Sequence, residues 1–466
     1  MRGRRWAVAG LLAVLMAGFA GGLSAQQQPV RLTLEQAVAR GLAEGEEVKA
    51  ARARRDLAEG QVIQARSGAL PQVSAQLGYT RTIRSLFDDL RMIPSGGDGE
   101  DGSEGENPFA SLPFGQRNAW VAGVTIAQPL YAGGKVGAAL GIARDVRLAA
   151  DLDVEEVEAD LTLQIRTAYF QAVLANELVK IAEEAYKLAS DQLAQVELFH
   201  RQGTASEFDV LRARVERDNL EPNIVEAKNA LRVAELNLKR LINLPAEQPL
   251  ELVTPLDPVI ADVDRQALEE GMTRRPALAA LDAVVSAREG AIKVAKGDRL
   301  PTITAVGSFA QQAFPRRGVP FDTDWRHDWT VGIQASIPVF DGLRTAGQID
   351  QAEAELRQAQ LQRAQLREAL KLELEAALGE FEAARAQIEA RRATVAQARR
   401  ALELAELRFQ SGLATQLELS NARLMLEQAR VNEAQSLFNY VSALARLERV
   451  SGGVVPLVAP RLPAGG

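Results

Sequence analysis

Apolar residues recur every seven positions over long stretches of this chain. One such series in the second half of the chain consists of Leu374, Phe381, Ile388, Val395, Leu402 and Phe409. Small residues, such as Ala377 and Ala384, lie three positions after members of the series. This pattern predicts a long helix that packs through a coiled-coil seam. The same register occurs in the first half of the chain, from Ile165 to His200, and predicts a matching helix there.

Other stretches alternate apolar and polar residues with a period of two, which predicts β-strands with one apolar face. The clearest are VSAQLGYT (73–80) and WTVGIQASI (329–337), and a second Trp-led stretch begins at residue 120. We expect four strands in all, two in each half of the chain. The residues predicted for the apolar face are Val73, Ala75, Leu77, Tyr79, Trp120, Trp329, Val331 and Ile333.

Matching motifs at regular offsets indicate a tandem duplication. Trp120 recurs as Trp329 and Gly203 as Gly412, with one and the same offset. The Leu-Pro step at 70–71 recurs at 300–301, with a larger offset. The first copy therefore holds an excess segment between its Leu-Pro step and its Trp. We predict a signal peptide (1–25), a first repeat (26–245), a linker (246–263), a second repeat (264–450) and a tail (451–466).

Each repeat should contain a helix, two strands and a long helical hairpin. The first helix is expected from about Leu34 to Arg66, and its counterpart from about Arg265 to Lys296. The run from about 134 to 202 contains no proline and would extend about 100 Å as a helix, at 1.5 Å per residue. The predicted fold class is mainly α with a small β part.

A glycine turn ends each long helix. Gly203 and Gly412 stand where a helix needs a left-handed residue after its last turn. Ser206 with Asp209, and Thr415 with Glu418, supply the S/T-x-x-acid pattern that begins the next helix. Any antiparallel helical hairpin would use such a turn, so turn chemistry alone does not make the tips functional.

Composition and charge exclude several functions. The chain has no Cys and only two His, and it shows no nucleophile–base pair, phosphate loop or metal cluster, so we expect neither an enzyme nor a cofactor. The net charge of −7 becomes −10 without the three arginines of the leader, which argues against nucleic-acid binding. The basic, then apolar, then small-residue N-terminus predicts export. An acidic stretch within 88–106 is read as an extracellular loop, with a calcium loop as the alternative.

Strand number decides between the possible architectures. Four strands cannot close a barrel, and an open sheet in a membrane would leave unpaired edges. Several protomers could pool their strands, and three would form a 12-stranded barrel with the apolar side towards lipid. The alternative is a periplasmic structural coiled-coil protein with a small soluble sheet and no channel activity.

The chain resembles the TolC-like outer-membrane efflux proteins over nearly its whole mature length. The resemblance rests on segments 274–310, 337–349 and 408–430, and on 128–140 and 240–245 in the first copy. It implies a homotrimer in the outer membrane of a Gram-negative-type bacterium, with periplasmic helices. Such a trimer is the exit duct of a tripartite efflux or type I secretion system, including multidrug efflux. Its partners would be a periplasmic adaptor (membrane fusion) protein and an inner-membrane pump of the RND, ABC or MFS type.

The resemblance also implies roles for the two tips. They would surround the periplasmic aperture, with Glu418, Asp209 and Asn421 at the opening. The Arg that helps lock the closed aperture in the best-studied relatives is replaced here by Ala414, and a second acidic residue of those relatives is replaced by Asn421. The residues expected to dock the adaptor are Arg201, Gly203, Thr204, Ala205, Phe409, Ser411, Gly412, Leu413 and Ala414.

Overall fold

The computed structural model describes residues 29–84, 116–258, 260, 262–315, 319–320 and 324–453. The predicted signal peptide, the acidic stretch 88–106 and the end of the predicted tail lie outside the described residues. The chain forms two compact units. The first comprises segments 1–52, 153–278 and 366–466, and the second comprises segments 53–152 and 279–365.

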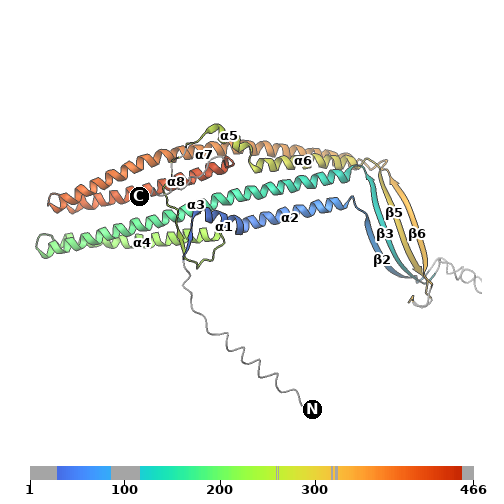
Figure 1. The fold of residues 1–466 in the computed structure, drawn as a ribbon, viewed down its shortest axis with the longest axis horizontal. Coiled ribbons are helices and arrows are strands. Elements are labelled where there is room, and N and C mark those ends of the chain that lie inside the picture. Colours follow the sequence, from blue (N-terminus) through green and yellow to red (C-terminus); the bar gives the residue numbers. More distant parts are fainter. Residues whose placement is uncertain are drawn as a thin grey trace, which may run out of the picture. The chain divides into compact units, whose positions relative to one another are not determined.

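Two helical hairpins of equal length dominate the chain (Figure 1). Their helices are α3 (Lys135–Arg201) with α4 (Glu207–Leu241), and α7 (Arg344–Gln410) with α8 (Gln416–Val450). Helices α3 and α7 each have 67 residues, and α4 and α8 each have 35. Every helix boundary in one hairpin recurs in the other with the offset that relates the two tip glycines, so the duplication inferred from the sequence holds in the fold.

The seam residues pack as the heptad pattern predicts. Leu374, Phe381 and Ile388 are buried on α7, as is Ile165 on α3. The exception is His200, which is exposed at the end of α3 instead of packed in the seam. The coiled-coil packing of α3 therefore ends before the first tip begins.

The two shorter helices predicted as continuous are each broken, which corrects the prediction. The first divides into α1 (Leu34–Glu44) and α2 (Glu46–Ser67), and the second into α5 (Arg265–Thr273) and α6 (Pro276–Gly297). Gly45 is extended, and a Cβ there would lie 2.4 Å from a backbone oxygen of α1, so only glycine fits the break. In the second repeat Pro276 disfavours helical geometry at the residue before it. The two breaks fall at corresponding positions of the two copies, so they also belong to the repeat.

A short parallel sheet in the first unit was not predicted. Strand β1 (Val30–Leu32) pairs with β4 (Leu250–Leu252), which lies inside the predicted linker. The buried Tyr169 hydroxyl donates to the Leu32 carbonyl at 2.9 Å and accepts the Thr254 N–H at 2.9 Å. The linker is therefore fastened to α3 by a core tyrosine.

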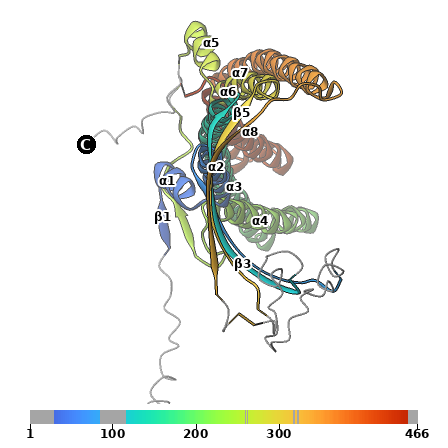
Figure 2. The same cartoon turned by 90° about the vertical axis from the view of Figure 1, so that its right-hand side faces the viewer.

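The second unit contains the four predicted strands in one antiparallel sheet, visible as a curved ribbon in Figure 2. They are β2 (Gln72–Arg81), β3 (Asn118–Ala132), β5 (Thr302–Ala313) and β6 (Arg326–Ser336), in the order β2-β3-β5-β6. Strands β2 and β6 therefore form the two edges of the sheet. None of the helices that the structure describes is long and apolar enough to cross a membrane.

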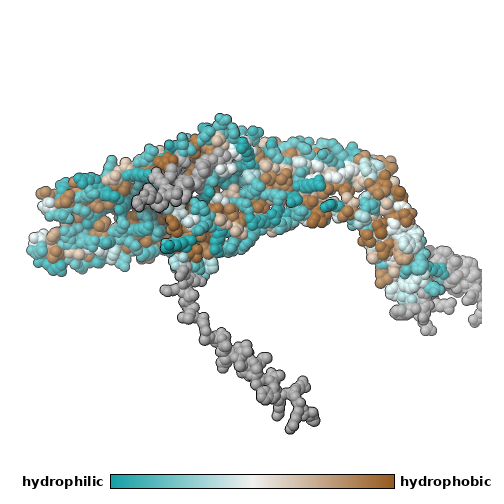
Figure 3. Space-filling model, in the orientation of Figure 1, coloured by the Kyte–Doolittle hydropathy of each residue, from teal (hydrophilic) through white to brown (hydrophobic). Residues whose placement is uncertain are grey.

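The strand register gathers the predicted apolar residues on one face of this sheet. Tyr79 lies opposite Trp120, and Phe309 lies opposite Trp329, with ring centroids 5.0 and 4.4 Å apart. Val331, on the edge strand, is 91% exposed. The space-filling view of Figure 3 shows many hydrophobic residues, in brown, over the sheet. An apolar face that no part of the described chain covers requires an apolar environment outside it.

Candidate functional site

Both hairpins end in the same hydrogen-bonded turn. Gly203 and Gly412 have φ values of +79° and +72°. Each glycine N–H donates to the carbonyl three positions earlier, at 2.9 and 3.0 Å, and the following N–H donates to the carbonyl five positions earlier, at 2.9 and 2.8 Å. This is the Schellman motif, in which a left-handed residue caps the helix. A Cβ would meet nothing within 4 Å at either glycine, so backbone conformation, not space, demands glycine.

At the first tip the acidic residue completes a capping box. The Asp209 N–H donates to Ser206 Oγ at 3.2 Å, and Asp209 Oδ2 accepts the Ser206 N–H at 3.0 Å and its hydroxyl at 2.6 Å. The hydrogen bonds from the Ser206 side chain and backbone lower the pKa of Asp209. This carboxylate is therefore engaged in holding the start of α4.

At the second tip the corresponding carboxylate, that of Glu418, has a different partner. The Glu418 N–H donates to Thr415 Oγ1 at 3.3 Å, but the reciprocal bond of a capping box is not formed. Instead, Glu418 Oε2 lies 3.8 Å from Nη2 of Arg408, which donates to the Leu413 carbonyl at 3.3 Å. Arg408 has Phe199 as its counterpart in the first repeat, so this ion pair belongs to the second tip alone.

The predicted docking residues lie together around the two turns. Phe409 packs against the buried cluster of the second hairpin, and Ala205 and Ala414 are partly buried. The remaining predicted docking residues are exposed: Arg201, Gly203, Thr204, Ser411, Gly412 and Leu413. The tips thus present a small polar and apolar surface on rigid turns.

The predicted aperture residues do not form one group. Asn421, one turn beyond Glu418, is exposed and lines a cavity of about 330 Å³ between the two hairpins. The same cavity is lined by Arg212 and Glu216 of α4 and by Leu417 of α8. Asp209 and Glu418 are not among its lining residues.

Polar contacts across this cavity were missed by the sequence reasoning. Arg423 of α8 donates to the Leu188 carbonyl of α3 at 3.2 Å and to Gln192 Oε1 at 3.4 Å. Burial lowers the pKa of Arg423. The Ser420 hydroxyl donates to Glu216 of α4 at 2.8 Å. Polar residues interrupting the apolar pattern of α8 were the available signal, but their partners lie in the other half of the chain.

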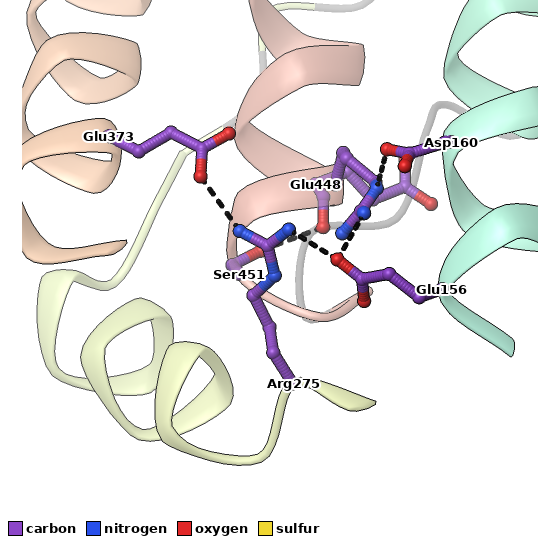
Figure 4. A network of polar contacts seen from close by, with 7 residues as sticks. Glu156, Asp160, Arg275, Glu373, Glu448 and Ser451 are labelled. Carbon is purple, nitrogen blue, oxygen red and sulfur yellow. Dashed lines mark hydrogen bonds and ion pairs between the residues drawn. The ribbon is translucent and has the colours of Figure 1, made fainter. Parts of the chain in front are cut away.

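A second polar cluster in the first unit joins α3, α7 and α8 to the connection between α5 and α6, far from the tips (Figure 4). Arg275 donates to Glu156 at 2.7 Å and to Glu373 at 2.8 Å, and Arg449 donates to Glu156 and, at 2.7 Å, to Asp160. Both arginine side chains are only 6% exposed. Burial alone would raise the pKa of Glu156, but hydrogen bonds and charge from Arg449 and Arg275 lower it.

Neither region carries the groups of a catalytic centre. Within the described ranges, no three His, Asp or Glu residues are placed so that they could hold a metal ion. The arrangement instead consists of a large apolar sheet face, two rigid tips and polar joints between helices.

Comparison with known proteins gives a consistent result. A family model described as outer membrane efflux protein matches residues 37–244 and 267–453. The cobalt-zinc-cadmium resistance protein CzcC of Cupriavidus metallidurans is 24% identical over 326 residues, covering 70% of this chain and 75% of that protein. The pyoverdine export outer membrane protein OpmQ of Pseudomonas aeruginosa is 24% identical over 423 residues, covering 90% and 85%.

Solved structures agree in fold. The outer membrane protein VceC from Vibrio cholerae superimposes with a TM-score of 0.72 at 20% sequence identity. The match covers 90% of this chain and 96% of that protein. The similarity therefore extends over the helices and the sheet together.

Proposed function

The chain belongs to the outer membrane efflux protein family, and we propose on that premise that three copies of it assemble into one export duct. Membership confirms the predicted family and the predicted role as an outer-membrane export channel. It excludes the alternative, a coiled-coil protein without a channel. The predicted fold class, mainly helical with two tandem repeats and four strands, is confirmed as well.

The proposal of three copies rests on the two free edges of the sheet. Unpaired strand edges are not tolerated in hydrocarbon. The edge strands β2 and β6 have 10 and 11 residues, close to the length of a membrane-spanning strand, and they run in opposite directions. Strand β6 of one copy can therefore pair with β2 of the next, and three copies would close an antiparallel barrel of 12 strands with an open lumen.

The apolar sheet face supports contact with outer-membrane lipid. Val331→Arg should cost about 2–4 kcal/mol near the bilayer midplane and block insertion. Thr330→Arg, one residue along the same strand and on the opposite face, is the matched control and should be tolerated. Equal tolerance of both substitutions would contradict the assignment of the faces.

The hairpins would form the periplasmic part of the duct, with the tips at its entrance. Two rigid glycine turns per copy provide six tips around a trimer, a repeated surface on which a periplasmic adaptor can dock. The adaptor would bring an inner-membrane pump into line with the duct. The pump would drive transport through the duct.

We also assign Glu418 to the entrance ring. Its carboxylate is free of the capping box that engages Asp209, so threefold symmetry can present three Glu418 side chains to the opening. Asp209 and Asn421 would lie nearby with smaller roles. Such a ring should attract cations, although Arg408 beside each Glu418 would weaken that attraction.

Membrane fractionation tests the proposed assembly directly. The full-length protein, produced with its N-terminal segment in a Gram-negative host, should separate with the outer membrane. It should migrate as a trimer on unheated denaturing gels and as a monomer after heating. A monomer recovered in the soluble periplasmic fraction would overturn the proposal.

A further inference from the structure

One face of α4 carries apolar side chains that no part of the described chain covers. They lie at steps of three and four positions, or at whole heptads from one another, so they line one side of the helix. The opposite side of α4 is buried at Ala213, Ala234 and Leu238, and Ala234 packs with Ala172 and Ala175 of α3. The exposed residues of this stripe are Phe208, Leu211, Val215, Val225 and Leu236. Helix α4 therefore has a second seam without a partner.

The internal repeat indicates what covers this stripe. Helix α8 is the counterpart of α4, and inside the chain α8 packs against the α3–α4 hairpin, where Ser420 donates to Glu216 at 2.8 Å. The counterpart of Ser420 in the first repeat is Leu211 of α4, and the counterpart of Glu216 in the second repeat is Met425 of α8. Both are exposed, at 50% and 61%. In a ring of alternating hairpins, the same contact must recur between the α4 of one copy and the α7–α8 hairpin of another.

We infer that the α4 stripe docks on the α7–α8 hairpin of a second copy, with Leu211 against Met425. The inference rests on the proposed assembly of three copies and adds the residues that join them near the tips. A second copy is the fitting occupant because the repeat supplies both halves of the contact and because both halves are apolar.

The contact between the two hairpins of one chain and the contact between copies then differ in chemistry, and both are called joints below. Inside the chain, the hairpins meet through the Ser420–Glu216 hydrogen bond, through Arg423, and through an ion pair between Arg430 and Glu184, beside a cavity of about 330 Å³ that leucines of all four helices also line. Polar groups that separate regain hydrogen bonds to water, so these polar contacts cost less to open than an apolar contact does.

Between copies, the corresponding contact brings together leucine and methionine. Apolar surfaces that separate must be rehydrated without compensation, so this joint resists opening. The tips should therefore spread by parting the two hairpins of each copy, while the joints between copies stay closed.

Paired cysteines test the contact, because the natural chain contains none. The Leu211→Cys, Met425→Cys double variant should form covalent trimers when the purified full-length assembly is treated with a short bismaleimide. The Glu216→Cys, Ser420→Cys double variant is the matched control and should link only within one chain. Trimers on denaturing gels in the first case, and monomers of altered mobility in the second, support the inference.

A charge exchange provides an independent readout that does not depend on cross-linking chemistry. Met425→Glu should weaken the trimer, and Leu211→Lys in the same chain should restore it by pairing opposite charges between copies. Native mass measurement distinguishes the possible failures. A trimer that is indifferent to both substitutions and gives no link between copies overturns the Leu211–Met425 contact but leaves the proposed duct standing. A monomeric wild-type protein in the same measurement would overturn both.

Discussion

The two hairpin tips share one backbone and use their acidic residues differently. Both turn on a left-handed glycine with matching hydrogen bonds. In the first tip Asp209 is held by Ser206, whereas in the second Glu418 faces Arg408. After the duplication, the backbone requirement was retained in both copies because few residues satisfy it, while the exposed side chains were free to diverge. The tips are therefore equivalent as turns and different as chemical surfaces.

Replacing Arg275, which lies in the break between α5 and α6, should have the largest effect. Position 45 is a glycine in the first repeat, and its counterpart in the second repeat is Arg275, buried between Glu156 and Glu373. Arg275→Met should lower the free energy of unfolding by about 3 kcal/mol, the low end for removing one partner of a buried ion pair, since Arg449 still contacts Glu156.

Arg274→Met is the matched control for this substitution. Its side chain is 79% exposed and lies 3.8 Å from Glu270, so its removal should cost less than about 0.5 kcal/mol. Chemical denaturation of the detergent-solubilised protein, followed by circular dichroism, measures both. Equal losses for the two variants would show that the buried cluster adds no stability.

The glycine of the second tip should give the next largest effect. Gly412→Val places a β-branched residue at a φ of +72°, which should cost about 1–2 kcal/mol and distort the turn. We expect normal trimers in the outer membrane but loss of export in a complementation assay. Gly412→Asn, which tolerates the left-handed region, should retain most export. Full export by the valine variant would contradict a docking role for this tip.

The capping box of the first tip should contribute less. Asp209→Ala removes the bonds to Ser206 and should cost about 0.5–1 kcal/mol. Because the pKa of Asp209 is lowered in the folded protein, its contribution is complete above the unfolded value of about 3.9 and is lost as the pH falls through the lower folded value. Denaturation midpoints of wild type and variant should therefore converge as the pH falls below the folded value.

Glu418→Ala should have the smallest effect on stability. An exposed ion pair of 3.8 Å contributes only about 0–0.5 kcal/mol. The variant should instead reduce cation selectivity and block by trivalent cations in single-channel recordings of purified trimers. Arg408→Ala should act in the opposite direction by leaving Glu418 unpaired. Unchanged selectivity in both variants would remove Glu418 from the entrance ring.

Much of the fold follows from local pattern. The heptads of α7 and the absence of proline in α3 predicted both long helices, and the alternation at Val73 and Trp329 predicted strands and their apolar face. The break at Gly45 was missed because a lone glycine inside a helical pattern is usually tolerated. The β1–β4 pair was missed because such short strands carry too little alternation to detect.

The sequence by itself determined the repeat, the lengths of the hairpins, the glycine turns and the two faces of the sheet. These depend on backbone conformation and on periodicity, which neighbouring residues along the chain specify. Only the tertiary structure decided that Glu418 faces Arg408 instead of completing its capping box, that Arg423 reaches α3, and that Arg275 is buried. Such contacts join side chains whose rotamers and partners are set by packing between distant segments, and no local pattern encodes that choice.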